Sequence, residues 1–476
     1  MSSDSSTPGG DAGGSWRPAQ VRAGQLLKKP AFWIFPLAVA SIMVILLTVF
    51  YIGSVVNPLG HLRGLPVAVV NADRGATVGT RRIDVGQSVQ AALSRSPAIA
   101  SPLALTDTTL GSAEQAMNRD GYYATVVIPP GFTGSLLSLA GVAPSGPRYA
   151  RPEIVILTNQ RAGTEGASLA SGILEPALAV VSRQIGRQLT AVAPAAASTP
   201  VTRAFLADPV TVTTVVYRPL PSHNALGLSA FYIALLTLLC GFVGGVITNS
   251  SVDAALGYAS TEIGTRWQQR RPVPINRWHT LVIKWVIAPV LAGVMTGLML
   301  IVAAGILRMD APHVGLLWLL IWLAATSVAI GTIALSAVFG LSLGQLLGLL
   351  LFVYAGLASA GGTVPLQALP APLRWLAEVE PLRQILSGTR AILYFDARAD
   401  AGLTRAVILA SVGLVFWLLV GTVVVRTYDR RGLTRMNPEL LAYVHASADD
   451  YQSRQDSAGQ QDSADPGRAA EPGDEA

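Results

Sequence analysis

Charged residues are scarce in this sequence. Asp, Glu, Lys and Arg make up 13% of its 476 residues, whereas a soluble domain usually carries about 25%. Hydrophobic residues reach 51%, which indicates that much of the chain faces something other than water. The net charge of +6 does not point to nucleic acid, because the basic residues stand beside apolar runs, as membrane topology requires.

Cysteine is limited to Cys240, which lies inside an apolar run. A single cysteine excludes an internal disulfide, so we expect each domain to be stable without one and Cys240 to be a small packing residue. The histidines are scattered without the spacing of metal ligands, and we predict no metal site. They are His61, His223, His279, His313 and His445.

Motifs for nucleotide binding and for zinc-dependent hydrolysis are missing as well. The sequence has no Gly-x-x-x-x-Gly-Lys-Ser/Thr phosphate loop and no His-Glu-x-x-His pair. No cluster of acid, base and nucleophile stands out, so we expect no catalytic residue, no cofactor and no enzyme. The apolar runs are nearly free of acids and bases in their central turns, which argues against proton-coupled transport. Lys284 lies a turn or two from one end and could reach the interface.

Six apolar runs are long enough for the roughly 20 residues that cross a bilayer. They span 31–53, 226–247, about 281–307, 315–339, 341–360 and about 403–425. The first exceeds the core of a cleaved signal peptide, roughly 7–15 residues, and we interpret it as an uncleaved anchor. A turn of small residues around Gly340 divides the fourth run from the fifth. The expected fold class is a polytopic α-helical membrane protein with six transmembrane helices.

Positive charge indicates which side each segment occupies, because cytoplasmic flanks are rich in Lys and Arg. The basic flanks include Arg22, Lys28, Lys29, Arg266, Arg270, Arg271, Arg277, Arg426, Arg430, Arg431 and Arg435. With six spans they share one side, which places both termini in the cytoplasm of a plasma-membrane protein and residues 54–224 outside it. A second group falls on the outer side, in partial conflict: Arg374, Arg383, Arg390 and Arg398.

We expect residues 54–224 to form an extracytoplasmic α/β domain. β-rich runs predict strands at 65–70, 122–128, 153–157 and 210–217. Asp84 can cap a helix through about residue 94, and Asp107 another through 117, while 164–189 predicts a long helix. Residues 71–75, Asn-Ala-Asp-Arg-Gly, suit a turn. Small and polar residues predict disordered tails at 1–30 and 431–476.

The loop 248–280 contains a distinctive string, Thr261-Glu262-Ile263-Gly264-Thr265-Arg266-Trp267. It resembles the loop between the second and third helices of ABC-2-type exporter permeases, with Thr261 where that family more often has Arg. The resemblance implies a short coupling helix, broken near Gly264, that docks on a separate ATP-binding-cassette ATPase subunit. The contacts it implies are Glu262, Gly264, Thr265, Arg266 and Arg277. An ordinary basic loop is the alternative interpretation.

A second string follows the fifth run, where Gly361, Gly362 and Pro365 lead to Pro381 and Arg390. Helix-breaking residues at membrane depth are tolerated only where the backbone is buried in protein or lines a cavity. The segment is similar to the Gly-Gly-x-x-Pro turn and re-entrant pair that precede the last helix of ABC-2 permeases. The resemblance implies a re-entrant segment over 361–400 with these five residues at an external gate. An external loop with half-buried helices is the alternative.

Two strings in the outer domain, 65–75 and 121–132, resemble the YhgE/Pip (phage infection protein) group, whose relatives include the DUF3533 membrane proteins. Together the resemblances cover about 31–431. They imply one helix, the external domain, and then a five-helix ABC-2-type domain at 225–430.

These resemblances lead to a functional hypothesis. We expect the permease subunit of an ABC-2-type exporter, a homodimer or heterodimer in the lipid bilayer, that moves a hydrophobic or amphiphilic substrate while a separate subunit hydrolyses ATP. The substrate would be a lipid, a drug or a cell-envelope compound. The alternative is a non-transporting surface receptor or scaffold, such as a phage receptor or a secretion-machinery component, because a minimal permease does not need so large an external domain.

Overall fold

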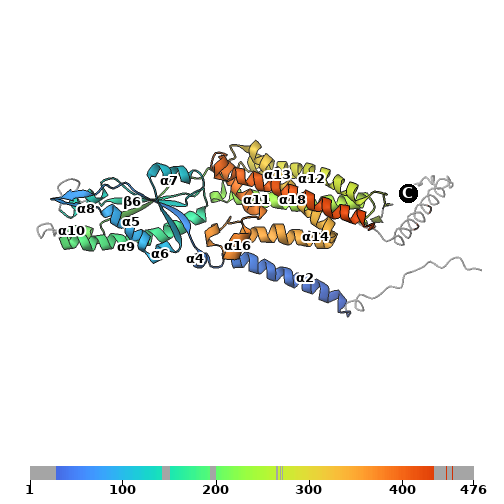
Figure 1. Ribbon diagram of the computed structural model, residues 1–476, viewed down its shortest axis with the longest axis horizontal. Helices are drawn as coiled ribbons and strands as arrows, with labels where there is room; N and C mark the ends of the chain where they lie inside the picture. The colour runs from blue at the N-terminus through green and yellow to red at the C-terminus, as the bar shows by residue number, and fades with distance from the viewer. Residues whose placement is uncertain are drawn as a thin grey trace, which may run out of the picture.

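The computed structural model describes residues 28–141, 151–192, 200–263, 266–268, 270, 272–433, 446 and 453. Figure 1 shows an elongated molecule with an α/β domain at one end and a helical bundle at the other. The tails predicted at 1–30 and 431–476 lie almost wholly outside the described residues.

Six of the described helical segments are long and apolar enough to cross a membrane. They match the six predicted runs one to one, and they fit a multi-pass membrane protein. They are Leu37–Val55, Ser229–Ala255, Arg277–Ile306, Val314–Phe339, Leu341–Ser359 and Leu403–Arg430. The first contains α2 (Ala31–Leu47), η1 (Thr48–Ile52) and α3 (Gly53–Val55), and the next two are α11 (Ser229–Ala255) and α12 (Arg277–Leu300) with η4 (Ile301–Ile306). The last three are α13 (Val314–Phe339), then α14 (Leu341–Gly348) with η5 (Leu349–Tyr354) and α15 (Ala355–Ser359), and finally α18 (Leu403–Arg430).

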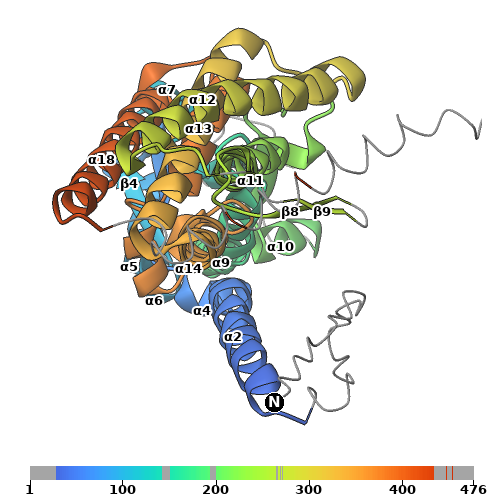
Figure 2. The same ribbon diagram turned by 90° about the vertical axis from the view of Figure 1, so that its right-hand side faces the viewer.

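The helix α13 occupies the centre of the bundle. Within its most apolar window 61% of residues are buried inside the molecule, whereas the windows of α2 and α18 are 6% buried. In Figures 1 and 2, α2 runs apart from the other helices. Its continuation meets the bundle through Phe50, which packs against Ala358 and Leu373. The apolar outer faces of α2 and α18 are what a lipid environment would cover.

The α/β domain is built on a five-stranded mixed sheet of order β4-β1-β5-β6-β7. Neighbouring strands run parallel except β5 and β6, which are antiparallel, with Val126 opposite Ile156. The strands are β4 (Leu103–Asp107), β1 (Leu65–Asn71), β5 (Ala124–Ile128), β6 (Glu153–Thr158) and β7 (Thr211–Val216).

The two faces of the sheet are covered by different helices, because successive side chains of a strand point to opposite faces. Leu65 and Val67 of β1 belong to the larger core, with side chains of α5 (Val85–Arg95), α8 (Phe132–Leu139) and α9 (Thr164–Val192). Ala68 and Val70 pack on the other face with Ala113 of α7 (Leu110–Met117). Figure 1 shows α7 on the side of the sheet opposite α5 and α9.

Most elements predicted for this domain are present: strands near 65–70, 122–128, 153–157 and 210–217, the long helix α9, and α5, whose N-cap is Asp84. The helix predicted from Asp107 is wrong at its start. Asp107 is the last residue of β4, and α7 begins at Leu110 with Thr109 as its N-cap. The strand β4 and the hairpin of β2 (Ala76–Val78) and β3 (Arg81–Ile83) were not predicted.

Short elements complete the described chain. They are α4 (Pro58–His61), α6 (Pro97–Ala100), α10 (Pro200–Ala207), η3 (Ala225–Gly227), β8 (Thr261–Ile263), β9 (Arg266–Gln268), η6 (Leu366–Ala368), α16 (Ala371–Leu376), α17 (Pro381–Tyr394) and η7 (Ala399–Ala401). Of these, α16 and α17 follow the fifth membrane-spanning segment and shape the site described next.

Candidate functional site

An apolar cavity of about 490 Å³ lies in the helical bundle between α13, η5, α17 and α18. Its size falls in the range of about 300–1,000 Å³ that is typical of small-molecule sites, and mostly apolar walls with few polar groups are typical of them too. The lining residues include Leu320, Phe352, Glu380, Gln384, Phe416 and Trp417. This cavity is the candidate functional site.

Glu380 is the acidic group of the cavity and is 3% exposed. It is the N-cap of α17, and its Oε2 accepts hydrogen bonds from the backbone N–H groups of Leu382 (2.7 Å) and Arg383 (3.3 Å). Its Oε1 is buried without a hydrogen-bond partner among the described residues. Burial raises the pKa of the Glu380 carboxyl to about 8, although the two backbone hydrogen bonds act to lower it.

Glycine lets α15 approach this carboxyl closely. A Cβ atom added at Gly356 of α15 would lie 2.7 Å from Glu380 Oε1. A larger residue at Gly356 would therefore displace the carboxyl, and the glycine is part of what fixes Glu380 in its position.

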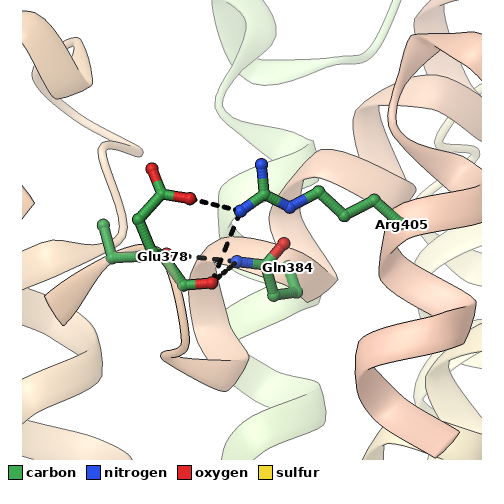
Figure 3. A network of polar contacts seen from close by, with 4 residues as sticks. Glu378, Gln384 and Arg405 are labelled. Atoms are coloured by element: carbon green, nitrogen blue, oxygen red, sulfur yellow. Dashed lines mark hydrogen bonds and ion pairs between the residues drawn. The ribbon is translucent and has the colours of Figure 1, made fainter. Parts of the chain in front are cut away.

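The loop that carries Glu380 is fastened to α18, as Figure 3 shows. Arg405 on α18 forms an ion pair with Glu378 and also donates from Nη2 to the Glu378 carbonyl at 3.4 Å. Gln384 donates from Nε2 to the carbonyls of Ala377 and Glu378, at 3.1 Å each. These contacts hold the connection between α16 and α17 beside the cavity.

Three aromatic rings form part of the cavity wall. Trp417 is central: its ring centroid lies 5.8 Å from that of Phe352 and 5.0 Å from that of Phe416, with the rings tilted by 72° and 71°. Phe352 belongs to η5, a π-helical segment of the fifth span. Such segments are frequent at functional sites.

A second cavity, of about 370 Å³, lies where α11 ends and α12 begins, at the end of the bundle away from the α/β domain. Asp253 and Lys284 line it and form an ion pair of 2.9 Å, with side chains 11% and 8% exposed. The expectation that Lys284 reaches the interface is wrong, because its ammonium group is paired inside the bundle. A buried ionic group in a membrane-spanning helix is a second functional candidate.

Of the predicted coupling residues, Arg277 lines this second cavity. The expected short helix is wrong, since Glu262 and Arg266 lie on the two strands of an antiparallel hairpin, β8 and β9, in which Glu262 pairs with Trp267. Gly264 and Thr265 fall outside the described residues. Arg277 is the first residue of α12, and its guanidinium donates to the Leu433 carbonyl at 3.3 Å and lies 5.5 Å from the Tyr428 ring centroid.

The predicted gate residues occupy two places. Gly361 turns the chain after α15 with φ +64°, a conformation that favours glycine. A Cβ at Gly362 would lie 2.1 Å from the Phe231 ring of α11, so only glycine fits there. Pro365 comes directly before η6 and directly after Val364, which packs against the core of the α/β domain. Pro381 and Arg390 lie on α17 instead, Pro381 in the cavity wall and Arg390 4% exposed.

Charged groups gather where the α/β domain meets α17. Asp120, in the turn after α7, lies near Arg383 and Arg390, and burial raises its pKa to about 6 although both arginines act to lower it. Nearby, Arg119 forms an ion pair of 2.8 Å with Asp400. Arg161 donates from Nη1 to the Tyr394 carbonyl at 3.0 Å. Polar contacts therefore join the two parts of the molecule.

Comparison with known proteins identifies the family. The family described as "Protein of unknown function (DUF3533)" matches residues 37–418. The chain belongs to the DUF3533 family. No curated protein matches it. Among solved structures, it is similar to the crystal structure of a domain assigned to an ABC type-2 transporter from Thermotoga maritima MSB8, with 20% identity and a TM-score of 0.22 over 32% of this chain and 85% of that one. A likeness of this size carries no inference about function.

In this DUF3533 protein three polar residues of the two cavities were not predicted as site residues from the sequence: Glu380, Gln384 and Asp253. One signal was present for Glu380, since an acid directly before Pro381 is typical of a helix N-terminus. Asp253 lies just beyond the run predicted at 226–247, which α11 extends to Ala255. Among the described residues no group of three or more His, Cys, Asp or Glu gathers where it could hold a metal ion.

One catalytic spacing also occurs in this DUF3533 chain. Residues 340–344 read Gly-Leu-Ser-Leu-Gly, the spacing of a hydrolase nucleophile elbow, which stands between a strand and a helix. Ser342 instead follows the helix α13 and lies in the first turn of α14. Its setting therefore differs from that motif.

Proposed function

We propose that this DUF3533 protein is the membrane subunit of an ABC-2-type exporter that moves a hydrophobic or amphiphilic molecule, with ATP hydrolysed by a separate subunit. The observation that supports this most is the 490 Å³ cavity among the helices, with apolar walls and a buried polar side formed by Glu380 and Gln384. Such a lining suits a molecule with a long apolar part and one polar group.

In this proposal the chain is a plasma-membrane protein with both termini in the cytoplasm and the α/β domain outside. The basic residues Arg277, Arg426 and Arg430 support that orientation, because they belong to the start of α12 and the end of α18, and these helix ends point away from the α/β domain in Figure 1. The subunit would act as a homodimer or a heterodimer, as ABC-2 permeases do.

The hairpin of β8 and β9 would contact the ATPase. Glu262 stands on β8 and Arg266 on β9, and Arg277 follows at the start of α12. Gly264 and Thr265 belong to the same sequence string and would contribute to the contact, although they lie outside the described residues. The buried pair of Asp253 and Lys284 ties the end of α11 to α12, the two helices between which the hairpin stands in the chain. A force on the hairpin would therefore act on both helices together.

The turn at Gly361, Gly362 and Pro365 would form the outer gate, with Pro381 and Arg390 of α17. The turn lies against the α/β domain, where the backbone N–H of Arg63 donates to the Gln367 carbonyl at 3.0 Å. Movement of the α/β domain and movement of this turn would therefore be coupled.

The test is affinity purification of the full-length protein from its own membranes, with bound proteins identified by mass spectrometry. We expect a stoichiometric ATP-binding-cassette subunit that is lost in the double variant Glu262→Ala/Arg266→Ala. The matched control is Arg95→Ala/Glu153→Ala, which changes one acid and one arginine on the exposed surface of the α/β domain and should retain the subunit. Recovery of envelope or secretion proteins through residues 54–224, with no ATPase, would favour the receptor or scaffold instead.

A further inference from the structure

We propose that the cavity of α13, η5, α17 and α18 selects amphiphilic cations, with the Glu380 carboxylate as the counter-charge; this assignment rests on the proposed function and specifies its substrate class. The cavity joins one buried acid to aromatic and aliphatic walls. That combination recognises a positive charge carried on an apolar body.

The Glu380 carboxyl group has one oxygen available to a ligand. The two backbone N–H groups of α17 bond to Oε2, whereas Oε1 has no hydrogen-bond partner among the described residues. An acid that is 3% exposed gains most from a positive group that reaches it inside the protein, because burial removes the competing water.

The arginines nearby are engaged elsewhere. Arg405 pairs with the exposed Glu378 on the outer side of the loop, and Arg383 lies near Asp120 and Tyr123 at the domain junction. Among the described residues that line the cavity, Glu380 is the one titratable group, and α13, η5 and α18 contribute apolar side chains and Ser327. No positive side chain among the described residues that line the cavity is therefore available to Glu380, which leaves its carboxyl free for a cation from outside the chain.

The aromatic wall of the cavity also favours a cation. The ring centroids of Phe352 and Phe416 lie 5.8 Å and 5.0 Å from that of Trp417. A ring face attracts a cation by about 0.5–2 kcal/mol, and the attraction grows as water is excluded. A diffuse cation such as a substituted ammonium or phosphonium would gain from both the rings and the acid.

Part of the cavity wall reaches the outer surface of the bundle. Three lining residues, Leu351, Val412 and Phe416, are 41%, 57% and 53% exposed on the apolar outer surface. In a membrane this surface faces lipid. An amphiphile dissolved in the bilayer could therefore enter sideways with its apolar part leading.

Binding of a cation would release a proton from Glu380. Because burial raises the pKa of this carboxyl to about 8, the empty cavity is mostly neutral at pH 7, and an arriving cation replaces the proton. The net charge of the cavity then stays unchanged. With one competing proton and this pKa, affinity for a permanent cation should increase about fifty-fold between pH 6 and pH 8.

The experiment uses the full-length protein in phosphatidylcholine nanodiscs and isothermal calorimetry, corrected with empty discs. The probes are tetraphenylphosphonium and tetraphenylborate, which share a shape and carry opposite charges. We expect saturable binding of one tetraphenylphosphonium per chain, at least about tenfold tighter than tetraphenylborate, and about fifty-fold tighter at pH 8 than at pH 6. Equal binding of the two probes, or binding of the cation that does not depend on pH, would overturn the proposal.

Two variants separate the charge from the helix cap. Glu380→Gln keeps an oxygen that can accept from the α17 amides, and it should lose at least about tenfold in affinity for the cation together with the dependence on pH. Asp107→Asn removes an exposed charge of the α/β domain, away from the cavity, and should bind as the parent does. Unchanged binding by Glu380→Gln would overturn the assignment, and the pH series on the unmodified protein tests it if this variant does not fold.

Failure of this inference can be told apart from failure of the exporter proposal, because the binding measurement needs no ATPase. Cation-selective binding that depends on Glu380, in a protein without ATP-driven export, would support the site and overturn the exporter. ATP-driven export of neutral amphiphiles without charge-selective binding would support the exporter and overturn the cation site.

Discussion

Lys284 Nζ lies 2.9 Å from Asp253 Oδ1 and joins α12 to α11 inside the helical bundle. The two side chains are 8% and 11% exposed, so water screens neither charge well. Removing one member of such a pair leaves the other charge buried, which typically costs about 3–5 kcal/mol, whereas replacing both costs far less. The pair therefore makes a clear prediction about stability.

We expect Lys284→Met to destabilise the bundle by about 3–5 kcal/mol and the double variant Asp253→Asn/Lys284→Met to recover most of that loss. Thermal unfolding in detergent, followed by tryptophan fluorescence, measures it, because none of the nine tryptophans lies within residues 54–224 and the signal reports the bundle. A single variant as stable as the parent would mean that Lys284 is solvated instead of paired.

Asp73 carries the second prediction, because its carboxylate joins the first turns of two helices. Its Oδ1 accepts from the Thr133 N–H (3.3 Å) at the start of α8, and its Oδ2 accepts from the Gly86 N–H (3.3 Å) at the start of α5 and from the Thr133 hydroxyl. It is 8% exposed. Asp73→Ala leaves two buried N–H groups without acceptors and should cost about 3 kcal/mol.

The control for Asp73→Ala is Asp84→Ala, which removes the N-cap bond of α5 to Gln87 N–H at 2.8 Å. Loss of such a cap costs about 1 kcal/mol. Hydrogen exchange measured by mass spectrometry should show faster exchange in β1, α5 and α8 for Asp73→Ala, and in α5 alone for Asp84→Ala. Identical exchange in the two variants would contradict the bridging role of Asp73.

The membrane spans could be predicted from the sequence, whereas the buried polar groups of the two cavities could not. The six spans were predictable because apolar length alone sets them, and β1 and β5 because their runs are rich in valine. The short strand β4 reads Leu-Ala-Leu-Thr-Asp and gains its stability from pairing with β1, which no local pattern reports. The burial of Glu380 could not be predicted, since it arises only when α17 packs against α15 and α18. The pair of Asp253 and Lys284 likewise comes from two helices.

The third prediction concerns glycines between α11 and α13. A Cβ atom at Gly245 would lie 2.8 Å from Thr332 Cβ and 2.9 Å from the Ala329 carbonyl. Both atoms belong to a buried helix that cannot give way, and small residues are what allow helices in a membrane to approach so closely. Gly245→Ala should therefore destabilise the bundle by about 1–3 kcal/mol through overpacking.

Gly244 is the matched control on the same helix. A Cβ there would meet only Met295 Sδ at 3.5 Å and Leu291 at 4.0 Å, which are ordinary contacts. Gly244→Ala should leave the thermal midpoint unchanged or raise it slightly, because alanine favours helix. If the two variants have equal midpoints by tryptophan fluorescence, α11 and α13 are less closely packed than the structure shows.

The last prediction is a dependence of stability on pH at the domain junction. Burial near Arg383 and Arg390 raises the pKa of Asp120 to about 6, above its ordinary 3.8. The folded protein therefore holds a proton at Asp120 that the unfolded chain releases between these values. The stability this contributes is fully present below pH 3.8 and is lost as pH rises through about 6. Asp120→Asn should remove this dependence on pH, because asparagine is neutral at every pH, and asparagine also tolerates the backbone of this position, where φ is +63°.

The thermal midpoints of the parent and of Asp120→Asn should therefore be similar at low pH and separate as pH rises from 3.8 to about 6, because the parent loses stability relative to the variant, and then run parallel. Comparing the two proteins cancels the titration of every other group, Glu380 included. Asp107→Asn changes an exposed acid at the end of β4 and should run parallel to the parent throughout. Parallel curves for Asp120→Asn as well would mean that its carboxyl is solvated. Separation of the two curves as pH rises would mean that ionisation of Asp120 weakens the junction between the α/β domain and the bundle.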